Sequence, residues 1–255
     1  MLKKYGLILI GLLALIALIM LYTPGKYSSK QDNIDQSCPD RPSRSLTNAE
    51  LNNAQKKTVY EVKTFNFGSI SGLSAKQLKE HNELYEGYVK KRNEIAQKLQ
   101  TTPKEGQNRT YSAYRALKIA ETYAVNGSIL HELYFENMSN KPSQIGSQMK
   151  ALIENSFGSI EAFKEDLMAA ALCSRGWVLT AYSLDDHLVH NYVLEEHNQT
   201  VPVLAIPLIV LDVYEHAYMI DFGIKRQPYL DVFWSQIDWN VAEARINKWV
   251  TPLKK

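Results

Sequence analysis

The sequence predicts an α+β fold in which a long α-helical hairpin precedes an α/β domain with a small antiparallel sheet. Two stretches of the first half, residues 73–97 and 112–138, carry apolar residues at helical spacing. Three short apolar runs of the second half are bounded by turn residues and flanked by helical patterns. Helices first, then a small sheet among further helices, is the order typical of α+β proteins.

Length and composition fit a globular chain. The 255 residues are 45% hydrophobic and 22% charged, which excludes collagen-like and wholly disordered chains. With 29 basic and 27 acidic side chains the net charge is +2, so we expect no nucleic-acid partner. Two cysteines, Cys38 and Cys173, are too few for a structural zinc cluster or a disulfide framework.

The first 22 residues are apolar and unlike the rest of the chain. Lys3 and Lys4 precede an apolar run over Gly6–Leu21, which is near the short limit of a membrane-spanning helix and long for a signal peptide. We expect residues 1–22 to be an N-terminal transmembrane helix, with a cleaved signal or a buried helix as alternatives. The chain would then be single-pass and membrane-anchored, with its globular part in the periplasm or another extracytoplasmic space.

The remaining chain divides into a tether and two halves. Residues 23–58 are polar, broken by Pro39 and Pro42, and read as a tether. We expect a helical-hairpin domain over residues 59–140 and an α/β domain over residues 141–255. Ser74 is a good N-cap for the first helix, and Ser159 for a helix of the second half.

The second half should contain four helices and three strands. The helices are expected over residues 149–155, 159–172, 229–234 and 240–250, and the strands over 177–182, 188–194 and 203–213. Asp185 and Asp186 provide the turn between the first two strands, and the third run reads as a central strand despite Pro207.

Candidate metal ligands lie at three places in the chain. Asp212 ends the third strand and His216 follows four residues later, which places a carboxylate and an imidazole on one side of a turn. His81 and His131 each lie on the inward face of one of the long helices. A lone histidine on an apolar face is more often a core residue, so these four form a site only if the fold brings them together.

Several motifs resemble the iron/manganese superoxide dismutase family. Asp-Val-Tyr-Glu-His-Ala-Tyr at 212–218 is similar to its metal-binding signature D-x-W-E-H-A-Y. The segments around His81, around His131, at 174–177 and at 226–239 follow the family pattern in the same order, and the resemblance covers residues 60–250.

The resemblance implies a site, an activity and partners. His81, His131, Asp212 and His216 match the four metal ligands, which would hold one iron ion per chain, or alternatively manganese. Tyr88 matches a tyrosine that orders water and gates the substrate funnel, and His197 best fits the position that donates a hydrogen bond to the metal-bound solvent. The implied enzyme converts superoxide to oxygen and hydrogen peroxide. Glu215 and Tyr218 match interface residues, which implies a homodimer.

The sequence also departs from the family pattern. His81 and Tyr88 are seven residues apart, one fewer than usual, although both spacings keep one helix face. A family histidine that reaches the dimer mate is replaced by Leu84 or Tyr85, and Gly127 offers no side chain at the other donor position. The alternatives are a catalytically silent metal-binding relative acting as a membrane-tethered interaction module, and a metal-free structural domain.

Overall fold

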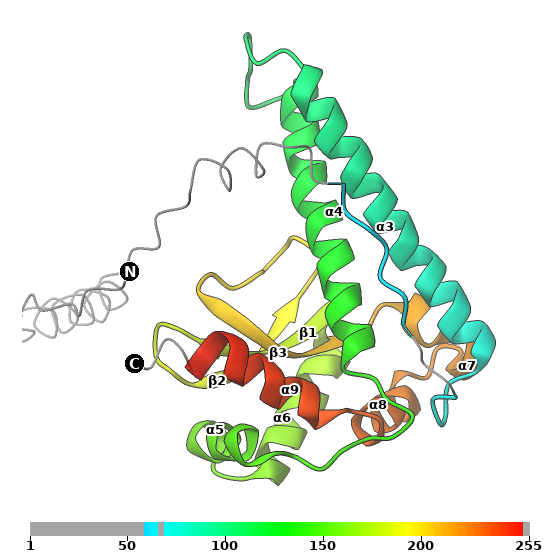
Figure 1. Ribbon diagram of the computed structural model, residues 1–255, viewed down its shortest axis with the longest axis vertical. Helices are drawn as coiled ribbons and strands as arrows, with labels where there is room; N and C mark the ends of the chain where they lie inside the picture. Colours follow the sequence, from blue (N-terminus) through cyan, green and yellow to red (C-terminus); the bar gives the residue numbers. More distant parts are fainter. Residues whose placement is uncertain (1–58, 66–68, 252–255) are drawn as a thin grey trace, which may run out of the picture. The chain divides into compact units, whose positions relative to one another are not determined.

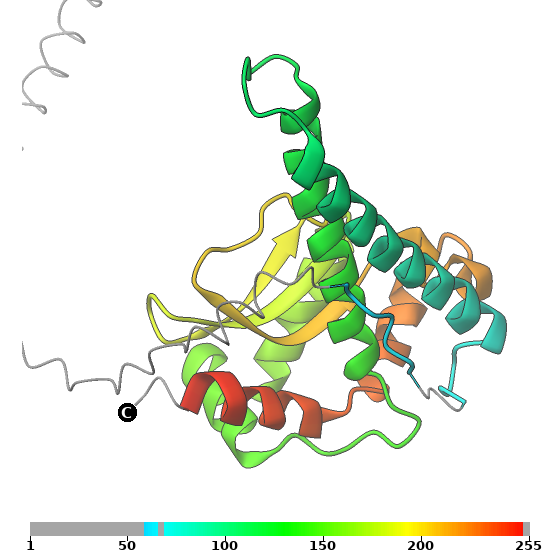
Figure 2. The same cartoon turned by 45° about the horizontal axis from the view of Figure 1, so that its top comes forward.

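Two long antiparallel helices dominate the first part of the fold. The structure, a computed structural model, describes residues 59–65 and 69–251. Helix α3 (Ala75–Thr101) and helix α4 (Ala113–Glu136) pair along their length, and their connection projects away from the rest of the described chain in both views (Figures 1 and 2). The expected hairpin is therefore present.

Serine side chains cap the N-termini of three helices. The Ser74 Oγ accepts a hydrogen bond from the Gln77 backbone N–H at 3.0 Å, which satisfies one of the free amides of α3. Ser112 does the same for α4. Helix α5 (Ser147–Phe157) has no such cap, whereas α6 (Ile160–Cys173) begins after Ser159.

Three antiparallel strands form the described sheet. Strand β1 (Trp177–Ser183) is buried throughout and lies between β2 (Val189–Leu194) and β3 (Ala205–Asp212). Helices α5 and α6 cover β1 and β2, whereas α4 packs on β3. Trp177 at the start of β1 lies opposite Asp212 at the end of β3, so the two side chains emerge on the same face of the sheet.

The third strand is an edge strand and contains a bulge, which corrects the expectation of a central strand. Thr180 pairs with Ile209 and Ala181 with Pro207, so Leu208 is the extra residue between them. Pro207 has no backbone N–H with which to bond a second neighbouring strand, which explains why β3 lies at the edge of the sheet. The Leu208 carbonyl instead accepts from the buried Arg245 guanidinium at 2.8 Å.

The chain after the sheet is helical. The short turn η1 (Glu215–Ala217) and helix α7 (Met219–Phe222) lead into α8 (Arg226–Ser235), α9 (Trp239–Arg245) and a final π-helical turn, η2 (Ile246–Val250). One continuous core joins the hairpin, the sheet and these helices. The α+β architecture with a small antiparallel sheet is thus the observed one.

The predicted transmembrane helix needs correction. No helix within residues 59–65 and 69–251 is both long enough and apolar enough to cross a membrane. The two long helices are instead amphipathic, with charged side chains along one face and the core along the other. The predicted span, Gly6–Leu21, and the predicted tether lie outside the described residues. Because the described structure contains no helix that could span a membrane, we withdraw the transmembrane helix from the description of the fold, together with the membrane partner.

Candidate metal centre

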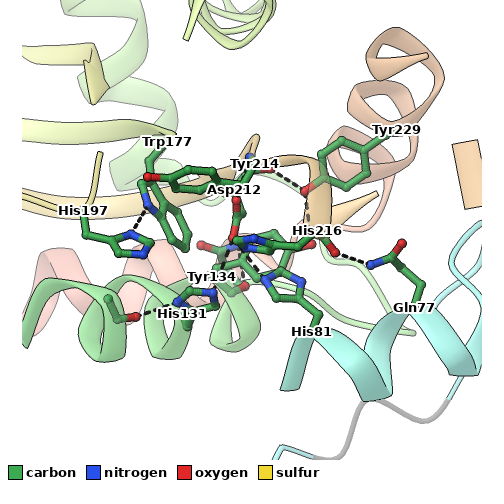
Figure 3. A network of polar contacts seen from close by, with 12 residues as sticks. Gln77, His81, His131, Tyr134, Trp177, His197, Asp212, Tyr214, His216 and Tyr229 are labelled. Atoms are coloured by element: carbon green, nitrogen blue, oxygen red, sulfur yellow. Dashed lines mark hydrogen bonds and ion pairs between the residues drawn. The ribbon is translucent and has the colours of Figure 1, made fainter. Parts of the chain in front are cut away.

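Four side chains from four segments of the chain meet in the core (Figure 3). They are His81 of α3, His131 of α4, Asp212 at the end of β3 and His216 of η1. The Asp212 Oδ2 lies 3.0 Å from His81 Nε2, 3.1 Å from His216 Nε2 and 3.7 Å from His131 Nε2. Three imidazole nitrogens therefore surround one carboxylate oxygen.

The cluster has the donor set and the spacing of a metal site. One ligand atom from each of the four residues lies within 4.8 Å of the others. His131 Nε2 is buried and has no hydrogen-bond partner in the described chain, which is costly for a polar atom unless something else binds it. Three imidazoles and a carboxylate suit a first-row transition metal such as iron or manganese. The residues therefore fit one such ion.

The protein holds Asp212 in place through its carboxylate and through its backbone carbonyl. The Tyr214 backbone N–H donates to Asp212 Oδ1 at 2.9 Å, which leaves Oδ2 for the three histidines. The Tyr229 hydroxyl donates to the Asp212 carbonyl at 2.7 Å and lies 3.2 Å from the Tyr134 hydroxyl. These contacts fix the end of β3 before any ligand binds.

Helix α3 also secures the turn that carries His216. The Gln77 amide donates to the His216 carbonyl at 2.5 Å, and its oxygen accepts from the Ile220 N–H at 3.1 Å. Gln77 lies one helical turn before His81, so the same helix supplies one cluster residue and positions another.

Burial and the Asp212 charge set the protonation states of the cluster. Burial lowers the pKa of His81 despite its hydrogen bond to Asp212, and lowers the pKa of His131 to about 3. Burial acts to raise the pKa of Asp212, but His216 and His81 outweigh it and the pKa is lowered. For His216 the Asp212 charge outweighs burial, so its pKa is raised. Neutral imidazoles and an ionised carboxylate are the forms that bind metals.

His131 presents a lone pair to the cluster because of its other nitrogen. Its Nδ1 lies 2.6 Å from the Gly127 carbonyl, which can only accept a hydrogen bond. The proton of the neutral ring is therefore on Nδ1, and Nε2 carries the lone pair. Backbone hydrogen bonds of this kind orient metal-binding histidines in general.

His197 has the opposite arrangement. The Trp177 indole N–H donates to His197 Nδ1 at 2.9 Å, so in the neutral ring the proton is on Nε2. That Nε2 is buried and has no hydrogen-bond partner in the described part of the chain. His197 is fully buried, and burial lowers its pKa to about 4. The ring lies 5.8 Å from that of His131, centre to centre, outside the four-residue cluster.

Tyr88 packs between the helices of the hairpin. Its ring stacks on the His131 ring, with the ring centres 5.2 Å apart. It also makes an edge-to-face contact with the His197 ring, with the centres 4.7 Å apart. A Cβ atom on Gly127 would lie 2.7 Å from Tyr88 Cδ1, so the absent side chain makes room for this ring. Burial and the neighbouring Tyr123 raise the pKa of Tyr88, which keeps its hydroxyl protonated.

The structure thus gathers all six of the predicted site residues in one region. The sequence reasoning gave no role to Trp177, Gln77 or Tyr123, which lie in or beside it. Tyr123 lies eight residues before His131, a spacing that keeps one helix face, and this was the available signal. The pairing of Trp177 with His197 had no such signal because twenty residues separate them.

Comparisons of the sequence with known proteins place this chain in a family. Residues 145–245 match the model of the C-terminal domain of iron/manganese superoxide dismutases. The chain is 40% identical over 188 residues to an iron superoxide dismutase of Aquifex aeolicus, covering 71% of this chain and 87% of the relative. An iron superoxide dismutase of Cupriavidus metallidurans is 33% identical over 193 residues, 73% of this chain and 96% of the relative.

A manganese enzyme is also similar. A manganese superoxide dismutase of Haloferax volcanii is 31% identical over 166 residues, which covers 65% of this chain and 82% of the relative. A buried site of three imidazoles and one carboxylate is typical of metalloenzymes that bind a first-row transition metal. The chain belongs to the iron/manganese superoxide dismutase family. These relatives lend no support to a single-pass membrane anchor or an extracytoplasmic location, and we withdraw both predictions.

Proposed function

We propose that His81, His131, Asp212 and His216 hold the catalytic ion of this superoxide dismutase, one iron or manganese ion per chain. The observation that carries the proposal is the arrangement of three imidazole nitrogens around Asp212 Oδ2, with His131 Nε2 buried and unpaired. The enzyme converts two superoxide anions and two protons into oxygen and hydrogen peroxide, and the bound ion supplies the one-electron exchange.

The protein residues set the surroundings of that exchange. Asp212 contributes the single negative charge among the four ligands, and the lowered pKa keeps that charge at neutral pH. His197 presents its Nε2 proton as a hydrogen-bond donor at the edge of the site, held by Trp177. Tyr88 excludes bulk water from His131 by stacking on it and offers a protonated hydroxyl. We assign both His197 and Tyr88 to catalysis.

Metal analysis of the full chain, combined with a superoxide-decay assay, tests this assignment. We expect close to one ion per chain, activity that disappears on chelation, and recovery on refilling. Bound metal without activity, or activity that survives complete removal of the ion, would contradict it.

Within this function we propose iron rather than manganese. The support is His197, which matches a position where the family pattern usually has a glutamine, together with the higher identity to the iron enzymes of Aquifex aeolicus and Cupriavidus metallidurans than to the manganese enzyme of Haloferax volcanii. Metal-free protein refilled separately with each ion decides the question. We expect the iron form to be the more active, and a protein active only with manganese would overturn the choice.

We also propose that the enzyme is a homodimer. A groove on the face that carries His216 is lined by Leu84, Met219, Ile220 and Glu215. The side chains of Leu84, Met219 and Ile220 are 41%, 44% and 40% exposed. Exposed apolar side chains grouped in this way favour association with a second copy of the chain. The family interface residue Tyr218 is buried within the chain against Tyr229, so it would act by supporting this face.

Sedimentation of a charged variant tests the dimer. Met219→Glu places a carboxylate in the groove and should shift the protein to monomer at micromolar concentration. Ile224→Glu is the matched control, because Ile224 is 84% exposed but does not line the groove. A monomeric wild-type protein, or equal effects of the two variants, would exclude this interface.

A further inference from the structure

Two buried tyrosines join the helix of His131 to the strand end of Asp212. Tyr134 of α4 and Tyr229 of α8 are both fully buried, so their hydroxyls have no access to bulk water. The Tyr229 hydroxyl bonds to the Asp212 carbonyl at 2.7 Å and lies 3.2 Å from the Tyr134 hydroxyl (Figure 3). Tyr134 follows His131 by three residues, which is less than one turn of α4. Two hydrogen bonds therefore connect the segments that carry two of the four cluster residues.

The acceptor at the end of these bonds fixes the order of donation. A carbonyl oxygen can only accept, so the Asp212 carbonyl uses the single proton of the Tyr229 hydroxyl. The contact between the two hydroxyls must then use the proton of Tyr134, with the Tyr229 oxygen as the acceptor. Burial raises the pKa of both tyrosines, so both hydroxyls keep their protons at neutral pH. The bonds thus run in series from Tyr134 through Tyr229 to Asp212.

Aromatic packing holds both rings in place. The Tyr134 ring stacks on Phe233 with the centres 6.0 Å apart, and its centre lies 5.1 Å from that of the His81 ring. The Tyr229 ring stacks on Tyr218 with the centres 5.2 Å apart. Phenylalanine at either position would keep these ring contacts and remove the hydroxyl alone. Tyrosine-to-phenylalanine changes therefore test the hydrogen bonds separately from the packing.

The two bonds act where the cluster is held least directly. His131 Nε2 lies 3.7 Å from Asp212 Oδ2, whereas the Nε2 atoms of His81 and His216 lie 3.0 and 3.1 Å from the same oxygen. His131 Nε2 has no hydrogen-bond partner in the described chain, so its distance from the carboxylate depends on how α4 lies against the end of β3. The tyrosine bonds join these two elements next to both residues.

Other bonds hold α4 and β3 together farther from the cluster. The Asn137 amide oxygen accepts from the Val210 N–H at 2.9 Å. The Arg245 guanidinium donates to a carbonyl of α4 and, at 2.8 Å, to the Leu208 carbonyl. These bonds reach β3 two and four residues before Asp212. Because they remain when a tyrosine hydroxyl is removed, the phenylalanine variants should still fold.

We propose that Tyr134 and Tyr229 are a positioning pair that sets the distance between His131 and Asp212, and with it the geometry in which the site binds a metal ion. The proposal rests on the proposed function of the site. Tyr229 is the more important member, because its hydroxyl both bonds the Asp212 carbonyl and accepts from Tyr134. Tyr134 acts through Tyr229, since a hydroxyl that accepts a hydrogen bond becomes a stronger donor.

Thermal unfolding of the metal-free full chain tests the order of the bonds. We expect Tyr229→Phe to lower the Tm by about 4 to 8 °C, because it leaves the Asp212 carbonyl and the Tyr134 hydroxyl without the partners they have here. Tyr134→Phe should lower the Tm by at most about 3 °C, because the bond to Asp212 remains. Adding Tyr134→Phe to Tyr229→Phe should leave the Tm unchanged or raise it, because it removes an unpaired hydroxyl. Additive losses in the double variant would overturn the series.

Binding of Co²⁺ to the full chain tests the effect on the site. Co²⁺ is a first-row ion whose visible absorption depends on the arrangement of its ligands, and competition with a chromophoric chelator gives its Kd. We expect Tyr229→Phe to weaken binding about tenfold and to shift the absorption bands, with the double variant matching it. Tyr134→Phe should weaken binding about twofold to threefold. The measurement is made at a temperature where every variant is folded, so a lower stability alone would change neither readout.

Tyr182→Phe is the matched control. Tyr182 is as buried as the pair, and its hydroxyl lies 3.1 Å from His187 Nδ1, at the end of β1 away from Trp177 and Asp212. Its Kd for Co²⁺ should stay within about twofold of the wild type, with the absorption bands unchanged. Binding by the wild type with no change in Tyr229→Phe, or with an equal change in Tyr182→Phe, refutes this inference alone. A wild-type protein that binds no Co²⁺ refutes the proposed function as well.

Discussion

His131 and His197 are two fully buried histidines whose ring nitrogens are bonded in the same pattern but carry the proton on opposite nitrogens. In each ring Nδ1 is bonded to the protein and Nε2 has no hydrogen-bond partner in the described chain. The partner of His131 is a carbonyl, which makes Nε2 an acceptor of metal ions. The partner of His197 is an indole N–H, which makes Nε2 a donor. One neighbouring atom thus decides whether a buried histidine binds the ion or assists it.

The two residues also differ in what lies in front of them. His131 faces Asp212, whose carboxylate favours a cation. His197 is instead packed among aromatic rings, from Tyr88, Tyr123, Trp177 and Tyr214. A cation beside His197 would lack a charged partner, and burial of an unpaired charge is strongly unfavourable. Charge and tautomer therefore lead to the same division of roles.

Removal of His131 should have the largest effect. His131→Ala deletes one of four ligands, and we expect activity to fall by more than about 100-fold together with the metal content. Elemental analysis and superoxide decay on the same sample measure both. His190→Ala, at the surface beside Asp186, should change neither.

Removal of His197 should leave the ion in place. His197→Leu is expected to keep the metal content while activity falls about 10- to 100-fold, because only the donor is lost. In His197→Gln the amide can accept from the Trp177 indole and still donate, so most of the activity should return. If His197→Leu loses metal as completely as His131→Ala, then His197 is a ligand and the contrast fails.

Loss of the indole donor should have a smaller effect. Trp177→Phe frees His197 Nδ1, and we expect the ring to populate both tautomers and activity to fall by about threefold to tenfold. Nitrogen-15 spectra of the imidazoles in the metal-free protein report the tautomer directly. An unchanged His197 spectrum would show that Trp177 does not set it.

Filling the notch of Gly127 should have the smallest effect. In Gly127→Ala the new Cβ would lie 2.7 Å from Tyr88, which pushes this ring off His131. The gain of about 1 kcal/mol in helix propensity offsets part of the strain, so thermal unfolding should change little while activity falls a few-fold. Gly87→Ala is the control for stability, because a Cβ there meets no atom within 4 Å, and it should stabilise the protein. Equal effects of the two variants would exclude a special role of the notch.

The sequence was sufficient to predict the helices and strands but not how they pack against one another. Helical spacing and the serine caps predicted both long helices, because these signals depend only on neighbouring residues. The same spacing put His81 and Tyr88 on one face of α3. Periodicity carries no information on how α3 is rotated against α4, so the meeting of His81 with His131 depended on the family resemblance.

Long-range contacts account for what was missed. The bond between Trp177 and His197 joins a strand to a loop that is itself held by Asn126 of α4. The edge position of β3 follows from Pro207 and the bulge at Leu208, which depend on what the neighbouring strand and Arg245 offer. The division of the chain at residues 140 and 141 stays a prediction.

The bulge in β3 has a consequence for insertions and deletions. Side chains alternate between the faces of a strand, and the extra residue at Leu208 shifts that alternation for everything after it. Asp212 emerges on the face of the ligand histidines with this shift included. A single codon lost or gained between Pro207 and Asp212 would turn the carboxylate to the opposite face, whereas the exposed connection near Tyr111 can change length freely. Among related chains, variation in length should therefore accumulate at the tip of the hairpin and stop short of this strand.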